Sequence, residues 1–284
     1  MKSDAFALRR VQKINKRTQI ILRLIAAILF LIIVTLAGIL MDSESYSPDY
    51  SAKKMPPSGE HLFGTDYLGR DMFYRTVKGL SLSILTGLLA AAVSSVIALF
   101  LGILSATMGR KVDFIVNWLV DLCMGIPHIV LIMLISIAMG RGVKGVIIGV
   151  AFTHWPSLTR VIRAEVLQIR NSQYVMAAKK LGKSNWWIAR NHMLPHVIPQ
   201  YIVGLVLLFP HAILHEASVT FLGYGIPLDM PAIGIILSES VKHLAVGMWW
   251  LVVFPGIALI LVVIMFDSIG DNLKAIIDPY SAHQ

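Results

Sequence analysis

Charged residues are scarce in this chain, and their scarcity excludes an ordinary soluble domain. Of the 284 residues, only 14% are Asp, Glu, Lys or Arg, whereas 56% are hydrophobic and the mean hydropathy is +0.73. Soluble globular domains carry about 25% charged residues. The composition therefore predicts a protein that lies within a membrane.

Two further absences restrict the chemistry. The single cysteine, Cys123, has no second cysteine with which to form a disulfide or a thiolate metal site, and we interpret it as a small apolar residue inside a helix. The pattern G-x-x-x-x-G-K-[ST], whose backbone cradles nucleotide phosphates, does not occur. Any ATP that drives this protein must therefore be bound by another subunit.

Long apolar segments are what the sequence has instead. A helix needs roughly 20 apolar residues to cross a hydrocarbon core of about 30 Å. We predict an all-α, polytopic membrane protein in which segment 1–19 precedes the first span and segment 42–79 is an outer loop. The six predicted transmembrane helices cover residues 20–41, 80–107, 114–138, 143–160, 197–220 and 247–269. The end of the fourth is interrupted by Pro156 and Arg160.

The distribution of basic residues predicts the orientation in the membrane. Lys and Arg are retained on the cytoplasmic face, and with both termini cytoplasmic the inner segments hold 17 of the 25 lysines and arginines. We therefore predict a multi-pass protein of the cytoplasmic (inner) membrane whose N- and C-termini are both cytoplasmic. The net charge of +9 then reflects topology and attraction to membrane lipid, and no nucleic-acid partner is expected because that would require a folded, soluble basic face.

A polar insert, YVMAAKKLGKSNWWIARNHMLP, occupies residues 174–195 within a loop of about 170–196, between two apolar segments. In a helix, four residues of it would form one face rich in small side chains: Tyr174, Ala177, Ala178 and Leu181. Gly182 would end that helix as a C-cap glycine does. A short protruding helix of this kind suits insertion into a groove of another protein, although an ordinary basic loop is the alternative.

Two more motifs flank the apolar segments. The first, GTDYLGRD at 64–71, suits a tight turn that leads into an amphipathic helix at the membrane interface. The second, EASVTFLGYGIP at 216–227, ends in glycines and prolines that break a helix. Because irregular backbone at membrane depth is tolerated only where protein or a water-filled cavity covers it, the second motif is expected to line an outer gate.

Together the three motifs resemble those of the second permease subunit in ABC importers of the dipeptide, oligopeptide and nickel family. The spacing of Ala177 and Ala178, Gly182, and Leu194-Pro195 is similar to that of the EAA loop, through which such permeases meet their ATPases. GTDYLGRD resembles the sequence before the second span, and EASVTFLGYGIP resembles an EASLSFLGLG-type sequence. The chain departs from the motif at Met176, where Glu is usual, and at His192, where Ile is common.

The resemblance implies a type I ABC importer permease fold, with a permease domain of five helices over 80–284. It also implies the partners: a second homologous permease subunit, two ATPase subunits that hold ATP and magnesium, and an extracytoplasmic solute-binding protein. The chain itself would be a transport subunit rather than an enzyme, with no cofactor of its own. The implied ATPase-coupling residues are Tyr174, Ala177, Ala178, Gly182, Leu194 and Pro195.

Ionisable residues within the fifth predicted span indicate where cargo would pass. His211 and His215 lie four residues apart, on one face of a helix, with Glu216 beside them and His154 at the inner end of an earlier span. Ionisable groups inside a membrane are costly and mark functional sites, so His211, His215 and Glu216 are predicted to line the translocation path. Imidazole is a ligand for nickel, copper and zinc, which makes His211 and His215 a predicted metal-binding pair.

The H-x-x-x-H spacing before the FLG turn, with THW upstream, resembles the nickel-permease branch. Nickel or a metal chelate is therefore the favoured cargo, held transiently, and a dipeptide or oligopeptide is the alternative. Two remote alternatives are a passive channel, which would not need a docking loop, and an intramembrane metalloprotease. The latter carries H-E-x-x-H, whereas Ala212 follows His211 here. The histidines could also simply hydrogen-bond helix carbonyls.

Overall fold

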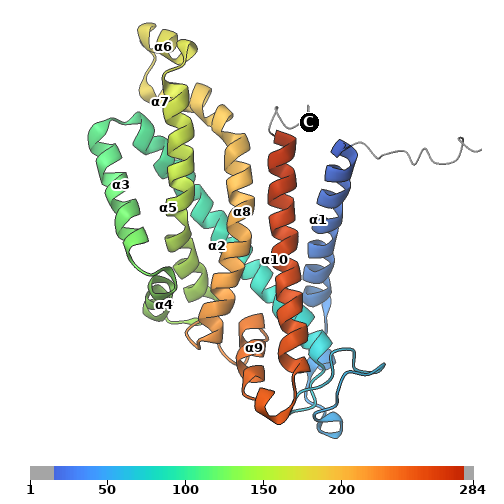
Figure 1. Ribbon diagram of the computed structural model, residues 1–284. Helices are drawn as coiled ribbons and strands as arrows, with labels where there is room; N and C mark the ends of the chain where they lie inside the picture. Colours follow the sequence, from blue (N-terminus) through green and yellow to red (C-terminus); the bar gives the residue numbers. More distant parts are fainter. Residues whose placement is uncertain (1–15, 278–284) are drawn as a thin grey trace, which may run out of the picture.

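The computed structural model describes residues 16–277, and nearly all of them are helical (Figure 1). Within this range the chain forms no β-strand beyond an isolated bridge between Thr65 and Asp71, which confirms the all-α prediction. The helices are α1 (Lys16–Leu40), α2 (Met72–Thr107), α3 (Arg110–Gly125), α4 (His128–Ala138), α5 (Gly142–Arg170), α6 (Gln173–Lys180), α7 (Asn185–Ile188), α8 (Leu194–Phe221), α9 (Ile233–Val241) and α10 (Trp250–Ile277).

Helix α2 is the longest and runs obliquely across the bundle (Figure 1). Its 36 residues extend about 54 Å, more than the roughly 30 Å of a hydrocarbon core. It packs against α1, α5 and α8, and small residues let it approach them closely. At Gly87, for example, a Cβ atom would lie 2.5 Å from Cγ1 of Ile213 on α8.

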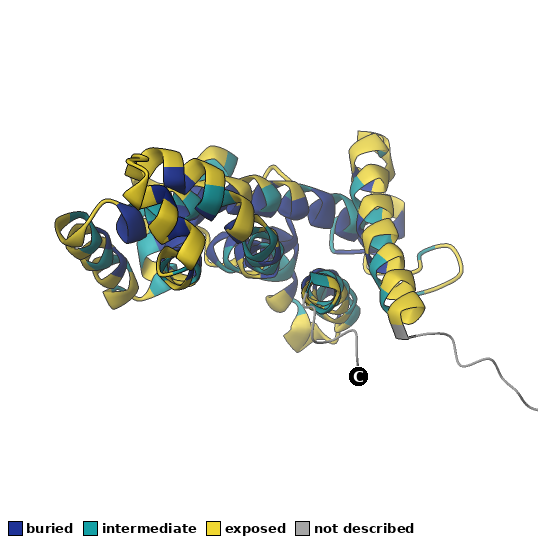
Figure 2. Cartoon of the chain, turned by 90° about the horizontal axis from the view of Figure 1, so that it is seen from above, coloured by how far each residue is buried: buried dark blue, intermediate teal, exposed yellow. Residues whose placement is uncertain are grey.

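Helix α1 stands at the edge of the bundle. In Figure 2 it is the helix that continues into the grey N-terminal trace, and exposed residues cover most of it. Apolar side chains such as Ile33, which is 64% exposed, point outward. An outward apolar surface is what a helix facing lipid requires, because no water is present to solvate polar groups there.

The apolar helices confirm a multi-pass membrane protein, whereas the predicted number of six spans is not confirmed. By length and composition, four helices of the described range can cross a membrane: α1, α2, the continuous run from α7 to α8, and α10. A fifth is obtained if α3 and α4 count as one broken span, because they meet at 96°. Helix α5 covers the fourth predicted span, but Arg160, Arg163 and Glu165 in its second half reduce its apolar character.

Two prolines act differently from each other. Pro127 precedes α4 and lacks an N–H, and it holds Ile126 in an extended conformation (φ −96°, ψ 136°), so the third predicted span breaks there. Pro156 was expected to interrupt the fourth span, yet α5 continues through it to Arg170. The carbonyl of Phe152, which Pro156 cannot bond, accepts a hydrogen bond from Trp155 Nε1 at 3.0 Å.

The segment predicted as an outer loop differs from the prediction in its secondary structure. Instead of a separate interfacial helix, segment 42–71 contains two short 3₁₀ turns, η1 (Ser43–Tyr46) and η2 (Tyr50–Ala52), and the predicted amphipathic helix is the start of α2. Asp71 caps α2, since its side chain accepts hydrogen bonds from the backbone N–H groups of Phe73 and Tyr74.

Helices α6 and α7 lie at one end of the bundle, and segment 42–71 and α9 lie at the other (Figure 1). The start of α1 and the end of α10 are both at the α6–α7 end, so the two ends of the described chain share one side. The assignment of that side to the cytoplasm remains a prediction. Residues 1–15 of the predicted cytoplasmic segment lie outside the described residues.

Candidate functional site

Histidines from three helices meet beside the break between α3 and α4. His128 begins α4, His154 lies near the middle of α5 rather than at its inner end, and His215 lies on α8. One ring nitrogen from each lies within 4.8 Å of the others, and the ring centroids are 4.5 to 5.1 Å apart. The structure therefore brings His154 and His215 together and adds His128, which the sequence analysis missed.

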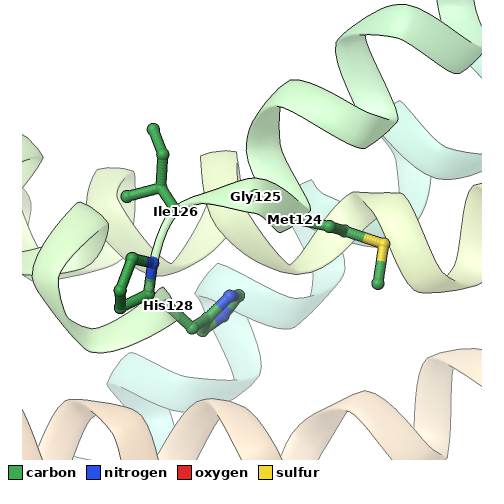
Figure 3. Close-up of a pocket in the computed structure, with 5 residues that line it drawn as sticks. Met124, Gly125, Ile126 and His128 are labelled. Atoms are coloured by element: carbon green, nitrogen blue, oxygen red, sulfur yellow. The ribbon is translucent and has the colours of Figure 1, made fainter.

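The break positions His128. Because α4 starts directly after Pro127 and turns sharply from α3, its first side chain points back toward α5 and α8. Figure 3 shows the side chains of His128 and Ile126 on opposite sides of this connection, beside a pocket of about 460 Å³. A second cavity of about 250 Å³ adjoins the histidines, and it is lined by Met124, His128, Thr153, His154, Pro156, Ser157, Leu208, His211 and His215.

The hydrogen bonds of His154 define which of its nitrogens is free. Its Nδ1 atom lies 2.9 Å from the carbonyl oxygen of Val150. A carbonyl oxygen can only accept, so Nδ1 carries the proton and donates to it, which leaves Nε2 with a lone pair. The side chain is buried, and Nε2 has no hydrogen-bond partner among the residues that the structure describes.

The other predicted path residues are separated from this cluster. His211 is exposed and lines the rim of the cavity without joining the three closest nitrogens. Glu216 is fully buried, and its Oε1 atom accepts a hydrogen bond of 2.9 Å from Thr220 Oγ1. Successive residues of a helix point about 100° apart, so Glu216 faces away from His215 and does not line the cavity. The closest group of ring nitrogens thus joins His128, His154 and His215, and metal binding by His211 and His215 stays a prediction.

The helix predicted to begin at Tyr174 ends at Gly182 as expected. This glycine has φ +75°, its N–H donates to the carbonyl of Lys179, and the N–H of Lys183 donates to that of Ala178. These two bonds form a Schellman motif, which a glycine with positive φ completes without strain.

The face predicted for this helix is divided between two environments. Ala178 is buried together with Val175, whereas Tyr174, Ala177 and Leu181 are exposed, Leu181 by 78%. Trp186 of α7 is exposed as well, by 60%. The inward residues attach α6 to the bundle, and the outward ones leave an apolar surface at its tip. Leu194 and Pro195 lie at the start of α8, which continues directly from α7 through the π-helical segment η3 (Ala189–Met193).

At the opposite end, GTDYLGRD is fixed by a network of charges. Asp66 Oδ2 lies 2.6 Å from Arg70 Nε and 2.9 Å from Arg75 Nη1. Both guanidinium groups also reach Glu239 Oε2 of α9, at 3.0 and 2.9 Å. The ion pairs therefore connect the GTDYLGRD turn to α9, which follows EASVTFLGYGIP in the chain. Within EASVTFLGYGIP itself, α8 ends at Phe221 and Gly223 has φ +83°.

A bundle of apolar helices with a sharply bent helix pair, a histidine-lined cavity between helices and a protruding helix pair is typical of a membrane transport subunit. The chain belongs to the family described as binding-protein-dependent transport system inner membrane component, whose model matches residues 98–279. It is the permease subunit of an ABC importer.

Individual relatives agree with this family. The chain is 32% identical over 253 residues to the dipeptide transport system permease protein DppC of Bacillus subtilis, covering 89% of this chain and 79% of that protein. It is 32% identical over 236 residues to the oligopeptide transport system permease protein OppC of the same organism, covering 81% and 77%. A crystal structure of an amino acid ABC transporter with histidines matches with a TM-score of 0.50 at 15% identity, over 74% of this chain and 94% of that one, and it supports the fold alone.

Proposed function

We propose that this permease imports dipeptides or oligopeptides across the cytoplasmic membrane. The observation that carries the proposal is the similarity, over most of the chain, to permeases named for dipeptide and oligopeptide transport. These relatives favour the peptide alternative over the nickel cargo that the H-x-x-x-H spacing suggested.

In this proposal two ATPase subunits dock on α6 and α7, and ATP-driven closure of the ATPases moves the helices between inward and outward openings. The exposed apolar tip around Leu181 supports this role, because exposed apolar patches mark protein interaction sites. A second homologous permease subunit completes the pathway, and an extracytoplasmic solute-binding protein delivers the peptide. Magnesium and ATP are held by the ATPases.

A transition metal ion or metal chelate is the second candidate cargo. One specific observation favours it, namely the three histidine rings that meet beside a cavity between α3, α5 and α8. Peptide transport alone does not require such a group of imidazoles.

Uptake assays in a strain that lacks this chain test the proposal. We expect the intact gene to restore uptake of a radiolabelled dipeptide in an ATP-dependent manner. Leu181→Glu should fail to restore it, because a charge on the apolar tip opposes docking, whereas the matched variant Leu181→Met should restore it. Restoration of nickel uptake with no change in peptide uptake would reject the peptide cargo.

A further inference from the structure

We propose that His128, His154 and His215 form a binding site for one divalent transition metal ion of the nickel, copper and zinc group. Its place on the translocation path rests on the proposed function, whereas metal binding itself rests on the geometry of the cluster. The metal would arrive as a free ion or within a small chelate, since both present the same ion with replaceable ligands.

The ring positions suit a shared ion. Imidazole nitrogens bind zinc at about 2.0–2.1 Å, so two nitrogens on one tetrahedral ion lie roughly 3.4 Å apart. One nitrogen from each of the three rings already lies within 4.8 Å of the others. The shortest approach in the structure, 3.2 Å, joins His128 Nε2 to His154 Nδ1. Rotation of the His128 and His215 rings about their χ angles would bring their nitrogens toward Nε2 of His154 while the His154 ring keeps its bond to Val150.

His154 is oriented as a metal ligand is. Its Nδ1–H donates to the carbonyl of Val150 one helical turn earlier, which fixes the ring and its tautomer. Metal-bound histidines typically donate their other N–H to a carbonyl or carboxylate in this way. The free Nε2 is buried without a hydrogen-bond partner within the described residues, and an unpaired buried polar atom is costly. A bound ion would satisfy it.

The chemistry of the donors selects the class of metal. The cluster offers neutral imidazole nitrogens, which suit nickel, copper and zinc, while magnesium and calcium prefer oxygen ligands. Three protein ligands leave a fourth position open, and here it would face the cavity that His211 borders.

Metal binding to the purified protein tests the site. The full chain, carrying a tag without histidines, is purified in lipid nanodiscs with its co-expressed partner subunits. It is dialysed against Ni²⁺ alone or against Ni²⁺ premixed with free histidine, and bound nickel is counted by mass spectrometry. We expect one nickel ion per chain, with an X-ray absorption spectrum dominated by imidazole nitrogen.

Variants separate the cluster from other histidines. His128→Gln, His154→Gln and His215→Gln should each weaken binding by roughly tenfold or more, while His196→Gln, at an exposed position on α8 outside the cluster, should not. Intact assembly is checked by co-purification of the partner subunits, and His154→Asn provides a second variant if His154→Gln does not assemble. Binding of the free ion identifies it as the source, and binding only with histidine present identifies a chelate.

Absence of stoichiometric nickel in both arms, or equal binding by the cluster variants and the wild-type chain, would overturn the proposal. The outcome is distinguishable from failure of the proposed function. If the wild-type chain bound nickel but did not restore peptide uptake, the peptide cargo would be rejected and the metal site kept. If it restored peptide uptake but bound no nickel, the metal site would be rejected and the peptide cargo kept.

Discussion

The two ends of the molecule differ in how far their side chains are paired within this chain. At the end formed by segment 42–71 and α9, four charged residues pair with one another, and two of them, Asp66 and Arg75, are almost completely buried. The four are Asp66, Arg70, Arg75 and Glu239. At the α6–α7 end, the chain leaves apolar side chains such as Leu181 and Trp186 in the open. The first surface is complete within this chain, whereas the second has the character of one half of an interface.

The contrast also predicts where each end can tolerate change. A buried charge network depends on every member, since removing one leaves the others desolvated and unpaired. An exposed tip affects the stability of the isolated chain little, and its substitution should appear in assembly and transport instead. Substitution of Asp66 at one end and of Gly182 at the other tests whether stability and transport depend on different ends of the molecule.

The largest effect on stability is expected for Asp66→Asn. The amide oxygen can still accept the backbone bonds that Oδ1 receives from Leu68 and Arg70. The amide nitrogen would replace Oδ2 and face two guanidinium groups, however, so both ion pairs are lost. Breaking a buried pair from one side costs about 3–5 kcal/mol, and the thermal stability of the chain in nanodiscs should fall accordingly.

The matched control for this variant is Asp121→Asn. Its pair with Arg160 is as short, at 2.6 Å, but the Asp121 side chain is 68% exposed, and exposed pairs contribute at most about 1 kcal/mol. Equal losses of thermal stability in the two variants would mean that burial of the outer network is not what stabilises this end.

An intermediate effect, confined to coupling, is expected for Gly182→Val. A β-branched residue at φ +75° costs about 1–2 kcal/mol, which would unwind the end of α6 and displace Leu181. Uptake should be largely lost and ATP hydrolysis uncoupled from it. Gly109 offers a control, because it also has positive φ and open space around it but lies in the turn between α2 and α3 rather than on α6 or α7. If Gly109→Val and Gly182→Val impaired uptake equally, the α6–α7 helix pair would have no special role in coupling.

Much of the architecture could be predicted because it follows from local chemistry. The length of the apolar segments predicted most of the long helices. Gly182, read as a C-cap residue, predicted the end of α6, and its φ of +75° agrees with that role. The broken third span and the long α5 could not be located by apolar length alone. Pro127 and Pro156 look alike in sequence, but only the second has a neighbouring indole N–H for the abandoned carbonyl. That difference lies in the residue directly before each proline, which is Ile126 in one case and Trp155 in the other, and apolar length does not register it.

The site was predictable only in part for a related reason. His211 and His215 attract notice by their spacing on one helix, and His154 by its position within an apolar segment. His128 lies at a helix break that sequence alone places inside a continuous span, so its approach to His154 and His215 has no local signal. The proline immediately before it is the one sequence feature that could have indicated a redirected side chain.

The smallest effect is expected for Glu216→Gln, which makes the same carboxylate-to-amide change as Asp66→Asn. Glu216 is as buried as Asp66, yet within residues 16–277 it makes no ion pair, and its hydrogen bonds come from the uncharged hydroxyls of Thr220 and Ser83. The amide oxygen of Gln also accepts from hydroxyls, so the change in stability should be below about 1 kcal/mol. Since Glu216 faces away from the histidine cavity, uptake and nickel binding should also stay unchanged.

Thermal stability and uptake are measured side by side for Glu216→Gln and Asp66→Asn. If Glu216→Gln lost as much thermal stability as Asp66→Asn, Glu216 would act as a charged group in the complete transporter, with a partner supplied by another subunit.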